Sequence, residues 1–281
     1  MLGAELSLLL ERAGVSYIGT GHEVDIQDPR ELAAFARGKT LKWIVNCAAY
    51  TAVDTAEDEE ALAFRRNAAG PENLARQAVS SGARLLHVST DYVFSGDGTR
   101  PYQESDPIDP RCAYGRTKAA GEARVMAVAP DSVIVRTAWL YGEYGPNFVR
   151  TMLRLMAEKE SVGVVDDQRG DPTWTRDLAE AIKVLVRIPS VPGGVYHFAG
   201  EGDITWYDFA CEIHRLGREY GILARDCRIR PLHTEQYPTK ARRPVYSVLN
   251  KDKVRGLGVR VPDWRESLRA FFDELTRTRG K

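Results

Sequence analysis

Short apolar segments alternate with longer helix-like segments along the chain, and this alternation constrains the fold more than any other feature. The apolar segments are nearly continuous runs of Val, Ile and Leu, which are typical of strands buried on both faces. Strands are expected at Val15–Ile18, Trp43–Cys47, Leu85–Val88, Val133–Thr137 and Val195–Phe198. Helices are expected near residues 4–13, 29–37, 57–81, 113–128 and 174–187. The pattern predicts an α/β fold built on a parallel sheet.

Charge and cysteine content exclude several classes of protein. Lys plus Arg and Asp plus Glu both total 39, so the formal net charge is zero, which argues against nucleic acid as the main partner. The start, MLGAELSLLLER, is neither a signal peptide nor a membrane span. The four cysteines include no CxxC pair, so we expect reduced thiols in a cytoplasmic protein. The five histidines form no zinc pattern, and we expect no protein-held metal.

Polar residues follow the predicted strands where a parallel sheet of this kind binds its ligands. Thr90 comes just after one strand, and its hydroxyl could donate to a substrate carbonyl, although Thr beside Asp is also a common turn. Tyr114 and Lys118 lie one helical turn apart, on the same helix face. A nearby ammonium lowers the pKa of a tyrosine, so the three residues together suit proton donation to a carbonyl. The alternative is that Tyr114 and Lys118 are ordinary surface residues.

Small and capping residues follow the strand at 43–47. Ala48 and Ala49 would let a flat cofactor approach the strand end, or else they serve tight helix–sheet packing. Thr51 with Asp54, and Thr55 with Asp58, match the spacing of helix capping boxes, and helix capping is the favoured role for them.

Several motifs then carry a resemblance to a known family. YGRTK (114–118), STDYVF (89–94) and NCAAYTAVDTAE (46–57) resemble an extended short-chain dehydrogenase/reductase. Together with VVDDQRGDPT (164–173) and YPTKARRPVYSVLN (237–250), they closely resemble the dTDP-4-dehydrorhamnose reductases, from Met1 to about Trp264.

The resemblance implies a Rossmann-like, doubly wound parallel sheet with a smaller C-terminal substrate-binding lobe. The dinucleotide-binding domain would span residues 1–140 and the lobe mainly residues 141–281, with 173–200 and 238–250 returning to the first domain. The implied reaction is hydride transfer from NADPH, with NADH left open, to C4 of dTDP-4-dehydro-L-rhamnose. A related nucleotide-sugar 4-ketoreductase or epimerase, and a non-catalytic cofactor-binding regulatory subunit, stay open as alternatives. A homodimer is also left open.

Site residues carried over from the resemblance fall into three groups. Thr90 would orient the keto oxygen, Tyr114 would supply the proton, and Lys118 would lower the tyrosine pKa and bind the nicotinamide ribose. The cofactor side would include Gly3, Asp25, Ile26, Ala48, Ala49 and Thr51, together with Tyr114 and Lys118. The substrate side would include Trp139, Asn147, Gln168, Thr173, Arg242 and Arg243. An arginine pair suits a diphosphate, but Arg242 and Arg243 could also be a solvated turn, and Trp139 a core residue.

The glycine-rich turn of such a fold is matched only in part. Gly3 matches its third glycine, whereas the first strand and the first two glycines have no counterpart. In the sheet order 3-2-1-4-5-6 that first strand would lie between Val15–Ile18 and Leu85–Val88. We therefore expect an open slot there or a collapsed sheet, and weak dinucleotide binding. The segment GTGH (19–22) leaves the choice between NADPH and NADH undecided.

Overall fold

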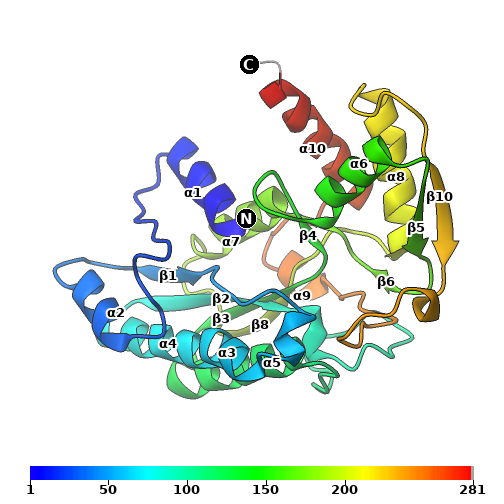
Figure 1. The fold of residues 1–281 in the computed structure, drawn as a ribbon. Helices are drawn as coiled ribbons and strands as arrows, with labels where there is room; N and C mark the ends of the chain where they lie inside the picture. Colours follow the sequence, from blue (N-terminus) through cyan, green and yellow to red (C-terminus); the bar gives the residue numbers. More distant parts are fainter. Residues whose placement is uncertain (280–281) are drawn as a thin grey trace.

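A parallel sheet lies at the centre of the fold in the computed structural model, which describes residues 1–279. In these residues the sheet has four strands, in the order β1 (Trp43–Asn46), β2 (Arg84–Thr90), β3 (Val133–Thr137) and β8 (Gly194–His197) (Figure 1). All the pairings are parallel. The predicted α/β fold is therefore confirmed, and the four predicted strands that form lie within about two residues of their expected bounds.

The predicted strand at 15–18 and the slot beside it are both wrong. Residues 15–18 form no strand, and the side chains of Tyr17 and Ile18 are exposed. The segment instead connects α1 (Leu2–Arg12) to α2 (Pro29–Ala36), while β1 lies directly against β2, with Trp43 opposite Arg84 and Asn46 opposite His87. The place expected for the slot is thus filled by β1, whose backbone groups pair with those of β2.

Helices cover both faces of the sheet. Leu86, Val133 and Val135 pack with α1 and α7 (Thr175–Leu185), whereas Leu85 and Ile134 pack on the other face with helices α2, α4 and α5. The bounds of the latter two are Gly70–Ser81 and Ala113–Val128. Side chains that alternate between two buried faces explain why the strands are apolar throughout.

The expected helix over residues 57–81 is divided into shorter pieces. A 3₁₀ turn, η1 (Thr55–Glu57), precedes α3 (Glu60–Phe64), and a π-helical turn, η2 (Arg65–Ala69), joins α3 to α4. Asn67 in the π-turn donates its amide hydrogen to the Tyr50 carbonyl and to the Thr117 hydroxyl, both at 3.1 Å. The irregular turn therefore ties the loop after β1 to helix α5.

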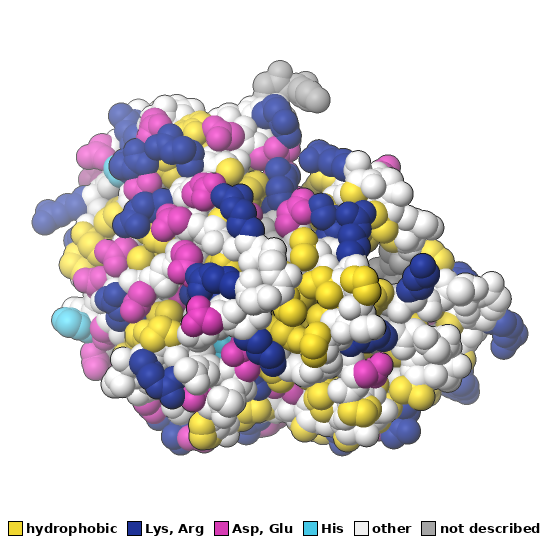
Figure 2. All heavy atoms as spheres, turned by 180° about the vertical axis from the view of Figure 1, so that it is seen from behind, with side chains coloured by type: hydrophobic (Ala, Val, Ile, Leu, Met, Phe, Trp, Pro, Cys, Tyr) yellow, Lys and Arg dark blue, Asp and Glu magenta, His cyan; other side chains and the backbone are white. Residues whose placement is uncertain are grey.

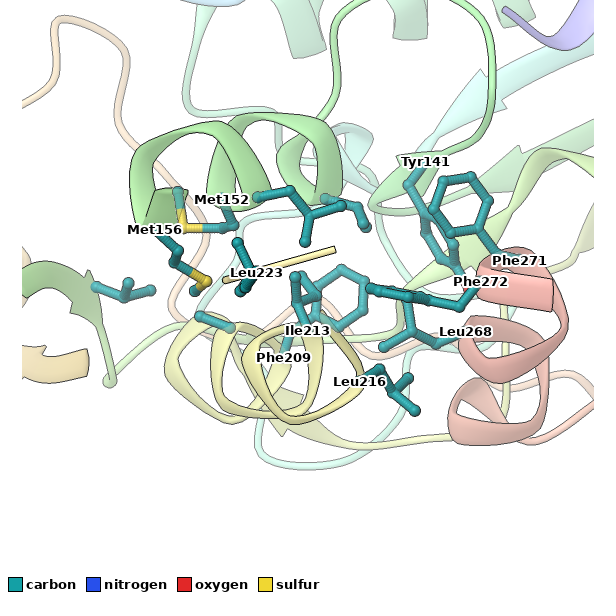
Figure 3. Close-up of a cluster of buried hydrophobic side chains, with 14 of the residues drawn as sticks. Tyr141, Met152, Met156, Phe209, Ile213, Leu216, Leu223, Leu268, Phe271 and Phe272 are labelled. Atoms are coloured by element: carbon teal, nitrogen blue, oxygen red, sulfur yellow. The ribbon is translucent and has the colours of Figure 1, made fainter. Parts of the chain in front are cut away.

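A second hydrophobic core forms away from the sheet. Three helices enclose it, and Tyr141, Phe209 and Phe271 meet inside it (Figure 3). These helices are α6 (Phe148–Glu158), α8 (Trp206–Glu219) and α10 (Trp264–Arg279). Short strand pairs complete the group: β4 (Leu140–Tyr141) with β7 (Thr173–Trp174), β5 (Ser161–Val165) with β10 (Arg228–Leu232), and β6 (Arg169–Gly170) with β9 (Ile204–Thr205). The remaining short helices are η3 (Asp91–Val93), η4 (Thr234–Gln236) and α9 (Asp252–Arg255).

Surface charge is mixed on the face seen from behind, where basic and acidic side chains are interspersed (Figure 2). Within residues 1–279, no helix combines the length and the apolar character needed to cross a membrane.

Gly121 fixes the distance between α5 and the π-turn. A Cβ atom at this position would lie 2.1 Å from the Asn67 carbonyl oxygen, well inside van der Waals contact. Helix propensity alone would make Gly121→Ala stabilising by about 1 kcal/mol. We expect the opposite sign, a loss of about 1–3 kcal/mol in the free energy of unfolding, because the helix must move away from rigid backbone.

Urea denaturation of Gly121→Ala measures this effect. Ala123, which is exposed on the same helix, gives the control: Ala123→Ser should change the free energy by less than about 0.5 kcal/mol. If Gly121→Ala is as stable as the wild type or more stable, the backbone at Asn67 moves away from the added Cβ at little cost.

Candidate functional site

Thr90 and Tyr114 meet at the carboxyl end of the sheet. Thr90 is the last residue of β2, and Tyr114 is the second residue of α5. The Thr90 hydroxyl donates to Asp91 Oδ1 at 2.8 Å and accepts from the Tyr92 amide at 3.2 Å. The Tyr114 phenol lies close enough to Thr90 for this hydroxyl to lower its pKa. Thr90 and Tyr114, which were expected at one crevice, therefore lie near each other in the structure.

Local contacts fix where α5 begins, and so where Tyr114 points. Cys112 Sγ accepts from the Gly115 amide at 3.4 Å, and Glu57 Oε1 accepts from the Ala113 amide at 2.7 Å. A Cβ atom on Gly115 would lie 2.2 Å from the Tyr92 carbonyl oxygen, so only glycine lets the helix start this close to η3. Tyr114 also packs edge-on against Tyr92, with the ring centroids 5.6 Å apart.

The phenol of Tyr114 is held in its protonated form. Burial raises the pKa of Tyr114, and the Thr90 hydroxyl opposes this only in part, while Asp91 raises it further. Lys118 is not among the main groups that shift this pKa, and its expected lowering of the pKa of Tyr114 stays a prediction. A neutral phenol is nevertheless the form that can donate a proton.

Lys118 lies beneath the strand ends and is 1% exposed. Its ammonium donates to the Val88 carbonyl at 2.7 Å and lies 3.4 Å from His87 Nε2. Burial lowers the pKa of Lys118 to about 8, against a raising effect of Glu122. An ammonium has three N–H donors, so after the bond to Val88 it retains donors for the hydroxyls of a ribose.

A buried chain of side chains supports Lys118 from below. Asn46 Oδ1 accepts from the Ala48 amide at 3.0 Å, which assigns its amide nitrogen, 2.9 Å from His87 Nδ1, as the donor to that ring. Burial, and secondly the charge of Lys118, hold the pKa of His87 well below its usual value. His87 is therefore a neutral ring that fixes the position of the lysine.

The residues expected on the cofactor side lie partly together. Ala48, Ala49 and Thr51 are exposed just after β1, so tight helix–sheet packing does not account for the two alanines. Gly3 approaches the same strand end, because a Cβ on it would lie 3.7 Å from Cys47 Cβ. These small residues leave room for a flat ring system beside Lys118, so they fit a nicotinamide cofactor.

Asp25 and Ile26 lie in the connection between α1 and α2. Asp25 is exposed, and its carboxylate accepts from the Gln27 amide at 2.9 Å. Ile26 packs against the helices of the α4 face, and its carbonyl accepts from the Asn73 amide group at 3.1 Å. Their present contacts are those of a turn and of a core residue.

Arg243 reaches the site, whereas Arg242 points elsewhere. Arg243 donates to the Tyr92 hydroxyl at 3.1 Å and to Asp54 Oδ2 at 2.5 Å. Arg242 pairs at the surface with Asp97 at 3.0 Å. Of the two arginines, Arg243 is therefore the one placed next to the Thr90 and Tyr114 group.

The capping role favoured for Asp54 and Asp58 is wrong. Asp54 precedes η1 without a capping hydrogen bond, and it instead accepts from the Ala241 amide and from Arg243. Asp58 pairs with Lys240. Both carboxylates thus hold the segment at 240–243 against the loop after β1.

The other residues expected on the substrate side differ in their surroundings. Trp139 has φ = 45°, a strained value for a non-glycine residue, and its ring stacks on Trp206 with the centroids 3.4 Å apart. Gln168 is buried and donates to the Thr234 hydroxyl at 3.1 Å, and Thr173 is fully buried in β7. Asn147 is the N-cap of α6 and accepts from the Arg150 amide at 3.2 Å. Asn147 is thus engaged in holding its own helix.

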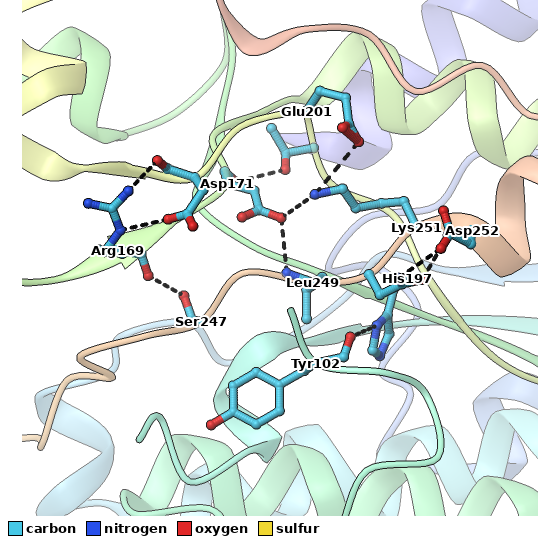
Figure 4. Close-up of polar contacts among 12 residues, drawn as sticks. Tyr102, Arg169, Asp171, His197, Glu201, Ser247, Leu249, Lys251 and Asp252 are labelled. Carbon is cyan, nitrogen blue, oxygen red and sulfur yellow. Dashed lines mark hydrogen bonds and ion pairs between the residues drawn. The ribbon is translucent and has the colours of Figure 1, made fainter. Parts of the chain in front are cut away.

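A buried ion pair fastens the segment that carries Arg243. Asp171 Oδ2 accepts from Lys251 Nζ at 2.7 Å and from the Leu249 amide at 3.0 Å (Figure 4). Ser247 adds a hydrogen bond from its amide to the Arg169 carbonyl at 2.9 Å. Burial raises the pKa of Asp171, and Lys251 opposes the shift. Breaking such a pair leaves an uncompensated buried charge, so it holds the segment firmly.

Several residues of the site escape sequence reasoning. Asp91, Tyr92 and Asp54 all contact the residues predicted to act, and each stands within a motif already singled out, STDYVF or NCAAYTAVDTAE. In the part of the chain that the structure describes, no group of three or more His, Cys, Asp or Glu side chains is arranged to hold a metal ion.

The sequence is similar to a known family and to proteins of known activity over nearly its whole length. Residues 1–277 match the family described as the RmlD substrate binding domain. A Streptomyces griseus dTDP-4-dehydrorhamnose reductase is 44% identical, with 100% of this chain and 93% of that protein covered. A Streptomyces niveus dTDP-4-keto-6-deoxy-D-glucose reductase is 42% identical, with 98% and 94% covered.

A solved structure is similar over the same extent. The dTDP-4-dehydrorhamnose reductase of Bacillus anthracis, in complex with NADP, has a TM-score of 0.90 and 37% sequence identity, and the match covers 97% of this chain and 95% of that one.

Proposed function

The chain belongs to the family of dTDP-4-dehydrorhamnose reductases, and we propose that it reduces the C4 keto group of dTDP-4-dehydro-L-rhamnose to give dTDP-L-rhamnose. It is an NAD(P)-dependent oxidoreductase, and NADPH is the expected cofactor, because a similar structure holds NADP. The observation that carries the proposal is the placement of Tyr114 near Thr90, one helical turn from buried Lys118.

Tyr114 is proposed as the proton donor. Reduction of a ketone adds a hydride at carbon and a proton at oxygen, and the bound nicotinamide supplies the hydride. The raised pKa of Tyr114 keeps its proton in place until negative charge develops on the substrate oxygen. Lys118, one turn along the same helix face, would stabilise the phenolate that remains and hold the ribose.

Arg243 is proposed to bind the diphosphate of the substrate. Its guanidinium lies between Asp54 and Tyr92, and it can exchange the contact with the partly exposed Asp54 for phosphate oxygens. Trp139, Gln168 and Thr173 would line the sugar-nucleotide side, on the lobe that we propose for residues 141–281. For Asn147 and Arg242, the internal contacts favour structural roles.

Turnover with two keto sugars tests the proposed function. The purified protein is mixed with NADPH and either dTDP-4-dehydro-L-rhamnose or dTDP-4-keto-6-deoxy-D-glucose, and oxidation of NADPH is followed by absorbance. We expect faster turnover of the former. A preference for the latter would favour the related 4-ketoreductase activity, and binding without turnover would favour a non-catalytic subunit.

Arg243→Ala should raise the KM for the nucleotide sugar by about 10–100-fold and change kcat less, since a charge-assisted hydrogen bond contributes about 1.5–3 kcal/mol. Arg242→Ala is the matched control, because it removes the same charge one residue away, and we expect a change in KM of less than about threefold. Equal effects of the two substitutions would contradict the assignment.

We also propose a cellular context for the protein. Zero net charge and the interspersed charges of Figure 2 support a protein that does not bind nucleic acid. Four free cysteines in the described residues support a reducing, cytoplasmic location. A homodimer stays a prediction, which light scattering of the purified protein would check.

A further inference from the structure

The hydroxyl of Thr90 has no hydrogen left for a substrate. A threonine hydroxyl donates one hydrogen bond and accepts two. The single donor goes to Asp91 Oδ1 at 2.8 Å, and one acceptor site takes the Tyr92 amide at 3.2 Å. As long as Asp91 is ionised, the hydrogen of Thr90 points at a carboxylate and away from any keto oxygen beside Tyr114.

Asp91 itself is enclosed. It is 3% exposed, and its second oxygen, Oδ2, is buried without a hydrogen-bond partner among residues 1–279. Tyr92 faces it from its own turn, Tyr114 from α5 and Ser247 from the segment 237–250, while the Asp171–Lys251 pair lies beyond. A carboxylate so placed cannot lose the Thr90 hydrogen bond without being left uncompensated.

We propose that Asp91 is a positioning residue for the reduction, which takes up a proton when the keto sugar binds and thereby turns the Thr90 hydroxyl toward the substrate. The inference rests on the proposed function. One proton from solvent adds to the Asp91 carboxylate, and the new O–H donates to Thr90 Oγ1. Thr90 then donates to the keto oxygen, and so does Tyr114. Release of the product returns the proton to solvent, so no bond other than O–H changes.

The electrostatics of the site agree with this geometry. Burial raises the pKa of Asp91 to about 6, although the hydroxyls of Thr90 and Ser247 lower it. A bound nucleotide sugar excludes more water and brings negative phosphates nearby, and both changes favour the protonated carboxyl further. By linkage, a ligand that raises the pKa of a group takes up protons at pH values between the free and the bound pKa.

Calorimetry of a complex that cannot react tests the proposal. The full chain with NADP⁺ is titrated with dTDP-4-dehydro-L-rhamnose at about pH 7, in phosphate and in Tris, whose ionisation enthalpies differ. The difference in heat gives the protons taken up. We expect uptake approaching one proton per site in the wild type and none in Asp91→Asn, whose amide N–H donates to Thr90 permanently. Asp97→Asn, on the exposed loop that follows, should match the wild type.

The pH dependence of kcat gives a second readout, which a merely structural role would not produce. We expect kcat of the wild type to fall tenfold per pH unit above the pKa of Asp91 in the complex, and Asp91→Asn to lack this decline. Zero proton uptake by the wild type, or equal uptake by Asp91→Asn, would overturn the proposal even if turnover is normal. Failure of the wild type to bind or reduce the keto sugar would instead remove the proposed function, and this inference with it.

Discussion

Tyr114→Phe is expected to lower kcat for reduction of the keto sugar by about 10³-fold, within the range of about 10²–10⁴ that general acids contribute. The substitution removes the hydroxyl that is proposed to donate the proton and keeps the ring that packs edge-on against Tyr92. The affinity for the nucleotide sugar should stay within about threefold, because Arg243 and the rest of the substrate side are untouched.

Single-turnover measurements and direct binding titration separate these two effects. Tyr237→Phe is the matched control, since Tyr237 loses the same hydroxyl from a ring that is 58% exposed, and its kcat should equal that of the wild type. Turnover of Tyr114→Phe near the wild-type rate would show that another group supplies the proton.

Lys118→Met is expected to reduce both kcat and cofactor affinity. Loss of the buried ammonium removes the charge one turn from Tyr114 and the N–H donors that remain after the bond to Val88. We expect about 10²-fold in kcat, comparable to the loss of one electrostatic donor, and about tenfold in the Kd of NADPH.

Thermal denaturation shows whether the loss is functional or structural. A buried lysine is costly to desolvate, and methionine is apolar and of similar length, so Tm should not fall by more than a few degrees. A large fall in Tm, or a change confined to nucleotide-sugar affinity, would mean that Lys118 acts elsewhere than proposed.

Local pattern is sufficient where an element of clear helix or strand propensity is bounded by clear signals. The helix at 113–128 and the strand at 133–137 have the predicted bounds. Val15, Tyr17 and Ile18 have high strand propensity, yet a strand exists only where a neighbour pairs with it, and β2 pairs with β1 on that side. Pairing partners far apart in the chain cannot be read from propensity.

In the candidate site too, local sequence predicted some features, while others depend on partners far apart in the chain. Thr90 and Tyr114 were expected together because strand ends and helix starts meet at one edge of a parallel sheet. Asp54 was assigned to capping because its spacing from Thr51 matched a local motif, whereas its partner, Arg243, lies 189 positions away. The sequence also does not reveal the direction of the hydrogen bond at Thr90. It places Asp91 next to Thr90, but only the structure shows that the Thr90 hydroxyl donates its hydrogen to Asp91.

Strand β8 and Lys251 both follow their partners, β3 and Asp171, by many residues in the sequence, and this order affects how the chain folds during synthesis. Synthesis proceeds from the N-terminus, and domains generally fold as units once they are complete. β3 is finished at Thr137, but its neighbour β8 begins only at Gly194, so one edge of β3 emerges well before its partner. Asp171 is likewise synthesised before its partner Lys251, and a carboxylate without its cation is unfavourable in a closed core. The sheet should therefore close only after β8 has been synthesised, and the Arg243 segment only after Lys251 has followed.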